Sequence, residues 1–138
     1  IEEQLKLPES QISIIKLVDD LIRYAYNYRA SDVHIDPTEE KVAIRLRIDG
    51  VLYTMFELPK EIQEEVISRI KVLAGIRTDE HQNAHDGRIK FLLAKPTGNF
   101  SFDIRVSIAP TYYGEDAVLR LLVQYGEEFS LENLGFQI

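Results

Sequence analysis

Arginine side chains recur in four segments that have the pattern of β-strands. The segments are 45–50 (Arg-Leu-Arg-Ile-Asp-Gly), 85–89 (His-Asp-Gly-Arg-Ile), 102–107 (Phe-Asp-Ile-Arg-Val-Ser) and 114–122 (Gly-Glu-Asp-Ala-Val-Leu-Arg-Leu-Leu). Arginine on the polar face of a strand suits an anion held at a domain boundary, because the planar guanidinium bonds oxygen atoms bidentately and stays charged. The sequence contains no Gly-x-x-x-x-Gly-Lys-Ser/Thr loop to cradle a nucleotide. The pattern therefore predicts an accessory part of a phosphate-handling protein.

Two of these arginines, Arg88 and Arg105, are predicted to lie side by side on one polar face. They alternate with apolar side chains on two strands joined by a turn, and both apolar rows must face the core, which restricts the pairing register. A two-residue loop at Pro96-Thr97 sets Arg88 opposite Arg105, whereas a four-residue loop sets it opposite Ser107 with Arg105 one diagonal away. In either register the two side chains start within roughly 5–8 Å of each other.

Such a pair of like charges has two interpretations. In the first, Asp103 on the same face neutralises the arginines in a surface ion-pair cluster, which contributes only about 0–1 kcal/mol to stability. In the second, an anion such as a terminal phosphate comes from outside the domain. An arginine donated in this way can speed phosphoryl transfer by about 10³–10⁵-fold.

The composition is that of a globular protein of one domain. The chain has 138 residues, of which 45% are hydrophobic and 28% charged, and 23 carboxylates exceed 16 basic side chains. This acidic balance argues against general nucleic-acid binding, so no nucleic-acid partner is expected. There is no cysteine, no apolar run approaching the ~20 residues of a membrane helix and no signal-peptide pattern. Because the chain starts without Met, we expect a fragment of a longer protein.

The first half of the chain predicts a helix followed by strands. Residues 1–9 are interpreted as a linker, and Ser10 or Ser13 can cap a helix that ends near Tyr28. Apolar residues at helical spacing form its core face: Ile12, Ile15, Val18, Leu21, Ile22, Ala25 and Tyr26. Strands are predicted at 33–37, 42–48 and 51–56, with a two-residue turn at 49–50.

The second half predicts another helix and three further strands. Leu58-Pro59 opens the helix and Gly75 caps its end, because proline suits a first turn and glycine adopts the left-handed cap conformation. A polar stretch at 77–85 follows, then strands near 87–95, 99–108 and 115–123. The order of helix, strands, helix and strands predicts an α+β fold with a mainly antiparallel sheet and flanking helices.

Ordered motifs along the chain resemble the ATPases of type II secretion and type IV pilus assembly. They are the segments 30–37 (Ala-Ser-Asp-Val-His-Ile-Asp-Pro), 45–51, 69–75 (Arg-Ile-Lys-Val-Leu-Ala-Gly), 85–89, 103–107, 110–111, 114–115 and 118–122. The segment 130–136 (Ser-Leu-Glu-Asn-Leu-Gly-Phe) is similar to the connector that precedes the family's motor domain. The match spans roughly residues 30–136.

The resemblance implies that residues 10–125 form the PAS-like domain before a RecA-like motor domain, with residues 126–138 as the connector. It implies a homo-hexamer whose ATP, with Mg, is bound by the P-loop domain and approached by Arg88 and Arg105. Arg120 is expected to support this cluster at the nucleotide or to bind a neighbouring domain. Further implied are an inner-membrane platform protein as partner and a cytoplasmic location at the inner membrane.

The chain departs from the family pattern at one loop. Where the family commonly has Glu-Arg-Arg-x-Pro-Gln-Asp-Gly-Arg, residues 80–88 read Glu-His-Gln-Asn-Ala-His-Asp-Gly-Arg, so His81 and Gln82 replace two arginines while Arg88 is retained. The spacing of His34, His81 and His85 fits no common zinc pattern, so no metal site is expected. Without a P-loop, this chain alone should bind no cofactor and hydrolyse no ATP.

A second interpretation is a ligand-sensing or protein-interaction module, because a PAS-like sheet can hold a small molecule in its hollow. Large residues such as Phe91, Phe102 and Leu119 indicate a filled interior instead. A clear pocket would favour the module. For Arg45 and Arg47, a solvated strand face and a subunit contact are the alternatives.

Overall fold

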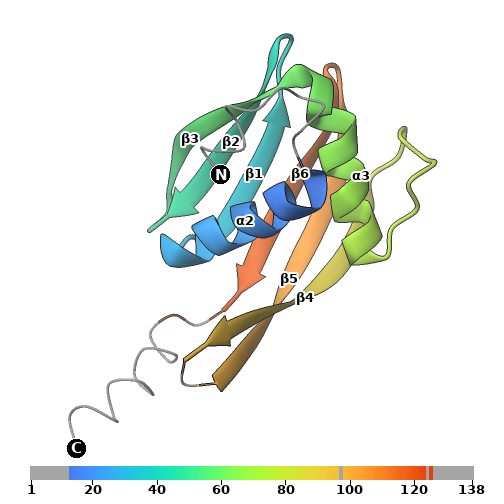
Figure 1. The fold of residues 1–138 in the computed structure, drawn as a ribbon. Coiled ribbons are helices and arrows are strands. Elements are labelled where there is room, and N and C mark those ends of the chain that lie inside the picture. Colours follow the sequence, from blue (N-terminus) through green and yellow to red (C-terminus); the bar gives the residue numbers. More distant parts are fainter. Residues whose placement is uncertain (1–12, 97, 124, 126–138) are drawn as a thin grey trace, which may run out of the picture.

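The computed structural model describes residues 13–96, 98–123 and 125 (Figure 1). In chain order the elements are α2 (Ile14–Asn27), β1 (Asp32–Pro37), β2 (Lys41–Ile48), β3 (Val51–Pro59), the short 3₁₀ helix η2 (Lys60–Ile62), α3 (Gln63–Ala74), β4 (His85–Lys95), β5 (Gly98–Thr111) and β6 (Gly114–Leu122). The linker expected at 1–9 and the connector expected at 126–138 lie outside the described residues.

The six strands form one open antiparallel sheet in the order β3-β2-β1-β6-β5-β4. Both helices lie across the same face of this sheet (Figure 1). The predicted α+β class with a mainly antiparallel sheet and flanking helices is therefore confirmed. Because α2 and α3 both lie on this face, the opposite face is left for polar side chains in the part of the chain that the structure describes.

Helix α2 begins where the sequence predicts a cap. The Ser13 side chain accepts a hydrogen bond of 3.3 Å from the backbone N–H of Lys16, which satisfies one of the free donors at the helix start. The predicted cap at Ser13 is thus confirmed, and Ser10 lies outside the described residues. One stripe of the helix is buried against the sheet: Leu17, Val18, Leu21, Ile22, Ala25 and Tyr26.

Helix α3 begins later than the sequence predicts. Leu58 and Pro59 do not open it, because both belong to β3, where Leu58 pairs with Val42 and is fully buried. A single 3₁₀ turn follows, and the α-helix starts at Gln63. Sheet pairing and burial of Leu58 therefore outweigh the helix-start preference of proline. The predicted end is confirmed, since Gly75 caps α3 in the left-handed conformation with φ 71°.

Two tight connections set the register of the hairpins. Asp49 and Gly50 have φ 51° and 81°, the left-handed values that a two-residue type I′ turn requires. In the second hairpin Lys95 pairs with Gly98, so only two residues join β4 to β5. The two-residue alternative for this loop is therefore the one the structure adopts.

The hydrophobic core lies between the helices and the inner face of the sheet. Strand residues facing it include Ile35, Ile44, Ile104, Ile108 and Leu119, each at most 2% exposed. Phe91 and Phe102 fill the β4–β5 side with ring centroids 5.7 Å apart. Among the helices the structure describes, neither is long and apolar enough to cross a membrane.

Candidate functional site

A row of charged side chains crosses five strands on the open face of the sheet. Asp32 on β1 lies opposite Arg47 on β2 and also opposite Arg120 on β6. Arg120 lies opposite Arg105 on β5, which in turn lies opposite Arg88 on β4. We call these five side chains the arginine row. Directly opposed residues in antiparallel strands point to the same face, with Cβ atoms about 4.5–5.5 Å apart.

The structure brings together all three arginines predicted as site residues. Arg88 and Arg105 occupy the register expected for the two-residue loop, and Arg120 adjoins Arg105 on its other side. All three side chains are exposed. Strand alternation explains their direction, because their neighbours Ile89, Ile104, Val106, Leu119 and Leu121 are buried on the helix side.

At one end of the row, a buried carboxylate holds two arginines. Asp32 is only 3% exposed, and its Oδ1 accepts a 3.0 Å hydrogen bond from Arg120 Nε. Arg47 Nε lies 3.9 Å from Oδ2, which also accepts a 2.8 Å bond from the Ser31 hydroxyl. Burial raises the pKa of the Asp32 carboxyl, but the hydrogen bonds from Arg120 and Ser31 and the charge of Arg120 outweigh burial and hold the pKa below its ordinary value.

At the other end, the positive charge has less compensation. Arg88 Nη1 lies 3.9 Å from Asp103 Oδ2, and the two side chains are 62% and 45% exposed. Arg105 makes no hydrogen bond and no ion pair with any residue the structure describes. The four guanidinium groups of the row are paired with only two described carboxylates, Asp32 within the row and Asp103 beside it, which leaves a local positive excess centred on Arg105. Like charges directly opposed in a ladder are unfavourable, so this excess favours an external anion.

The arrangement can bind and orient an anion but offers no group for breaking bonds. A guanidinium fork matches the oxygens of phosphate or carboxylate and keeps its charge at any physiological pH. Asp32 is occupied by Arg120 and Ser31, and its lowered pKa makes it a poor base. The site therefore supplies positive charge and geometry, and any reaction needs catalytic groups from elsewhere.

A second polar cluster holds the loop at 76–84 beside α3 and β6. Lys71 is fully buried, and its Nζ donates to the Glu80 carbonyl at 2.7 Å and lies 2.8 and 3.0 Å from the two carboxylate oxygens of Glu115. His81 Nδ1 is hydrogen bonded to Glu115 Oε1 at 2.7 Å. The loop that departs from the family pattern thus has a defined role here, because His81 shares the carboxylate that neutralises Lys71.

The same loop is closed by Glu80. Its carboxylate accepts a 2.6 Å bond from the Gln82 backbone N–H and is bonded to His85 Nε2 at 2.9 Å. The Gln82 bond, followed by bonds from Asn83 and His85, lowers the pKa of Glu80 to about 2 although desolvation opposes the shift. His85 is the first residue of β4, so this loop leads directly into the strand that carries Arg88.

Sequence reasoning missed the role of two residues in the row. The sequence predicts no site role for Asp32, and it predicts Arg47 only as a solvated or subunit-facing side chain. Their alignment depends on β1 pairing with β2 on one side and with β6 on the other. The sequence holds a partial signal, the Ser31-Asp32 pair at the start of a strand. No group of three or more His, Cys, Asp or Glu in the described ranges could hold a metal ion.

Comparisons with known proteins agree with the resemblance carried by the motifs. The family model for type II/IV secretion system proteins matches residues 8–138. The putative type II secretion system protein E of Escherichia coli (strain K12) is 41% identical over 133 residues, covering 96% of this chain and 26% of that protein. The type IV pilus assembly ATPase PilB of Myxococcus xanthus (strain DK1622) is 36% identical over 136 residues, covering 99% and 23%.

The chain spans about a quarter of the length of these two relatives. Among solved structures, the X-ray structure of the ATPase DotB from Yersinia pseudotuberculosis has a TM-score of 0.52 at 19% identity, covering 87% of this chain and 31% of that one. At this identity the likeness concerns the fold alone.

Proposed function

This chain belongs to the type II/IV secretion system protein family, and from that premise we propose that its arginine row contacts the phosphates of ATP held by a separate ATPase domain. The ATPase domain is the RecA-like motor domain of the same or a neighbouring subunit. Arg105 and Arg88 provide the contacts to the phosphate oxygens. Arg120 adjoins Arg105, Arg47 lies beyond Asp32, and the Asp32 carboxylate holds both.

The observation that carries this proposal is the state of Arg105. It is exposed, is flanked by arginines on both adjacent strands, and bonds to no residue the structure describes. A cluster serving stability alone would pair each arginine with a carboxylate, as Asp32 does for Arg120. The excess charge at Arg105 matches the triphosphate of a nucleotide, whose oxygens accept bidentate bonds from guanidinium.

The residues of this chain bind and orient, whereas the bound Mg-ATP supplies the phosphoanhydride bond to be hydrolysed. An arginine placed beside the terminal phosphate stabilises negative charge that develops during transfer. The stiff antiparallel sheet connects this contact to the rest of the domain, so movement of the nucleotide would be relayed to the fold as a whole.

We extend the proposal to the assembly that the family membership suggests. The chain works in a homo-hexamer at the cytoplasmic side of the inner membrane, where the relayed movement acts on an inner-membrane platform protein. Relatives named for type II secretion and for type IV pilus assembly support this setting. A homo-hexamer would also allow the arginine row of one subunit to reach nucleotide bound by the next.

The decisive experiment is steady-state ATP hydrolysis by the full-length protein that joins this domain to its ATPase domain. We expect Arg105→Ala to lower kcat at least tenfold, because an arginine supplied in this way contributes about 10³–10⁵-fold in other systems. Arg105→Lys should recover only part of the rate, since an ammonium lacks the bidentate fork. Arg77→Ala is the matched control, because Arg77 is exposed and its guanidinium bonds to Asp79 rather than to the arginine row. Unaltered turnover in Arg105→Ala would overturn the proposal.

The protein-interaction module keeps one specific observation in its favour. A cavity of about 520 Å³ opens between α2, α3 and β4, on the opposite side of the sheet from the arginine row. This is a separate surface, so it adds an interaction site to the proposed function rather than replacing it.

A further inference from the structure

Strand β4 forms one edge of the sheet and has the features of a strand that can accept a partner. Its eleven residues pair with β5 without any register shift and include no proline. The opposite edge is different, because β3 ends at Pro59 and has an irregularity in its pairing with β2. Proline and bulges are devices that prevent edge pairing, and β4 has neither.

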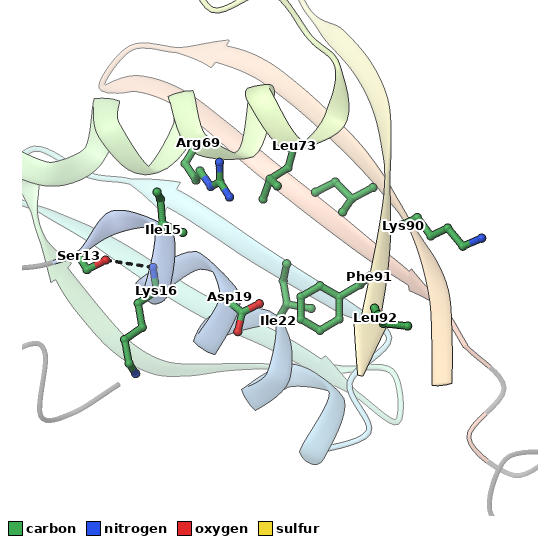
Figure 2. A pocket seen from close by; sticks show the side chains of 11 residues that line it. Ser13, Ile15, Lys16, Asp19, Ile22, Arg69, Leu73, Lys90, Phe91 and Leu92 are labelled. Carbon is green, nitrogen blue, oxygen red and sulfur yellow. Dashed lines mark hydrogen bonds between the residues drawn. The ribbon is translucent and has the colours of Figure 1, made fainter. Parts of the chain in front are cut away.

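Helix α3 covers only the start of this edge. An added Cβ at Gly87 would lie 2.6 Å from the Ala74 carbonyl oxygen, so the end of α3 sits directly on the strand there. Farther along β4 the two helices separate, and the cavity opens between them (Figure 2). The backbone of β4 at Lys90 and Leu92 lines it, while both side chains point away to the other face.

The cavity has an apolar wall on three sides. Ile15 and Ile22 come from α2, Leu73 from α3, and Phe91 from the inner face of β4 (Figure 2). Ile15 remains 61% exposed at the mouth. A volume of about 520 Å³ is within the roughly 300–1,000 Å³ typical of binding pockets, so it can receive a large apolar side chain.

One cation in the cavity lacks a counterion. Arg69 is half-buried on α3, its Nε is shielded from solvent without a hydrogen-bond partner, and no ion pair joins it to any described residue. The one carboxylate lining the cavity, Asp19, is already bonded to Arg23 Nε at 2.7 Å. An occupant with a carboxylate near Arg69 would neutralise this charge. A neutral or arginine-rich occupant would not.

We propose that the cavity and the adjoining edge of β4 bind an extended segment of a partner polypeptide. The segment adds to β4 as a further strand through main-chain hydrogen bonds, and its alternate side chains enter the cavity. Because side chains on one face of a strand recur every second residue, the recognised pattern is a large apolar residue and an Asp or Glu two positions apart. The carboxylate pairs with Arg69, and the apolar side chain packs against Phe91 and Leu73.

The test uses a phage-displayed library of random twelve-residue peptides selected on the immobilised chain. We expect enrichment of sequences in which Asp or Glu lies two positions away from Leu, Ile, Phe or Trp. The best enriched peptide is then synthesised and its dissociation constant is measured for the wild type and for four variants. An absence of enrichment, or enrichment without acidic residues, overturns the proposal.

The variants separate charge from folding. Ile15→Glu and Ile15→Lys form a matched pair at an exposed position, so both should fold. We expect affinity to fall at least tenfold more for Ile15→Glu than for Ile15→Lys, because both remove the same apolar contact and only the former repels a carboxylate. Arg69→Gln should also lose at least tenfold, whereas Lys90→Gln, whose side chain points away, should not. Equal affinity in Ile15→Glu and Ile15→Lys contradicts an acidic occupant.

Two further measurements identify the mode of binding and the class of partner. Two peptides are made, one N-methylated at the odd-numbered residues and one at the even-numbered residues; these are the two phases of methylation. Only one of the two should lose binding, because a strand donates every second backbone N–H to its neighbour. Loss in both phases or in neither overturns strand addition. Phosphatidylglycerol vesicles are the last probe, and the measurement is sedimentation of the chain with them. If the chain sediments in an Arg69-dependent way but binds no peptide, the cavity is assigned to an anionic lipid surface and the proposal is overturned.

Discussion

Asp32 and Arg120, which are 88 positions apart in the sequence, are joined by a 3.0 Å hydrogen bond on the open face of the sheet. The bond connects β1 to β6, the pairing that unites the two halves of the sheet. Asp32 also faces Arg47 on β2, so one buried carboxylate organises charge on three strands. The arginine row is therefore held at one end and open at the other.

Replacing Asp32 with Asn should lower the free energy of unfolding by about 1–2 kcal/mol. A hydrogen bond to a charged group contributes roughly 1.5–3 kcal/mol, and the exposure of Arg120 reduces that value. Urea denaturation of the isolated chain measures the change. Asp79→Asn serves as the control, because its pair with Arg77 lies in solvent and its loss should leave the midpoint unchanged. Equal midpoints for all three proteins would contradict the organising role of Asp32.

Replacing Arg105 with Gln should stabilise the chain slightly at low salt. The substitution relieves repulsion from Arg88 and Arg120, which is worth a few tenths of a kcal/mol for opposed like charges. At about 1 M salt the gain should vanish, since the screening length falls to about 3 Å. Denaturation curves at both salt concentrations give the comparison. Arg77→Gln should show no gain, because it loses a favourable partner. A destabilised Arg105→Gln would mean that Arg105 serves the fold rather than a ligand.

Replacing Lys71 with Met should be strongly destabilising, by about 3–5 kcal/mol. The change leaves the Glu115 carboxylate buried without its main counterion. Adding Glu115→Gln to the same chain should restore part of that stability, because the unpaired charge is then removed as well. Thermal unfolding of the wild type, the two single variants and the double variant gives the free energies of a double-mutant cycle. Strictly additive losses would argue against coupling between Lys71 and Glu115.

Glu80 should make stability depend on pH in the acidic range. Its pKa is about 2 in the folded chain against an ordinary value of 4.5, so the unfolded chain binds the proton more readily. The stabilising contribution is complete above about pH 4.5 and is lost as the pH falls towards 2. Glu80→Gln should therefore show a shallower fall in unfolding free energy across this window than the wild type. Parallel profiles for the two proteins would contradict the shift.

Local features of the fold could be read from the sequence because short-range physics decides them. Alternation of apolar and polar residues identified the strands at 42–48 and near 99–108, and Asp49-Gly50 identified a turn that requires left-handed conformations. Helix α3 shows the limit, since its predicted start at Leu58-Pro59 was overridden by sheet pairing of Leu58. Propensity at a helix start is weak compared with burial of a whole side chain.

The sequence by itself determined that Arg88 and Arg105 are neighbours, because two apolar rows on one short hairpin permit only registers of one parity. Only the tertiary structure decided that β1 lies between β2 and β6, which adds Asp32, Arg47 and Arg120 to the same row. It alone decided where the helices part beside β4 to leave Arg69 at a cavity. Strand order and helix placement follow from contacts between distant segments, and no local periodicity encodes which of those contacts forms.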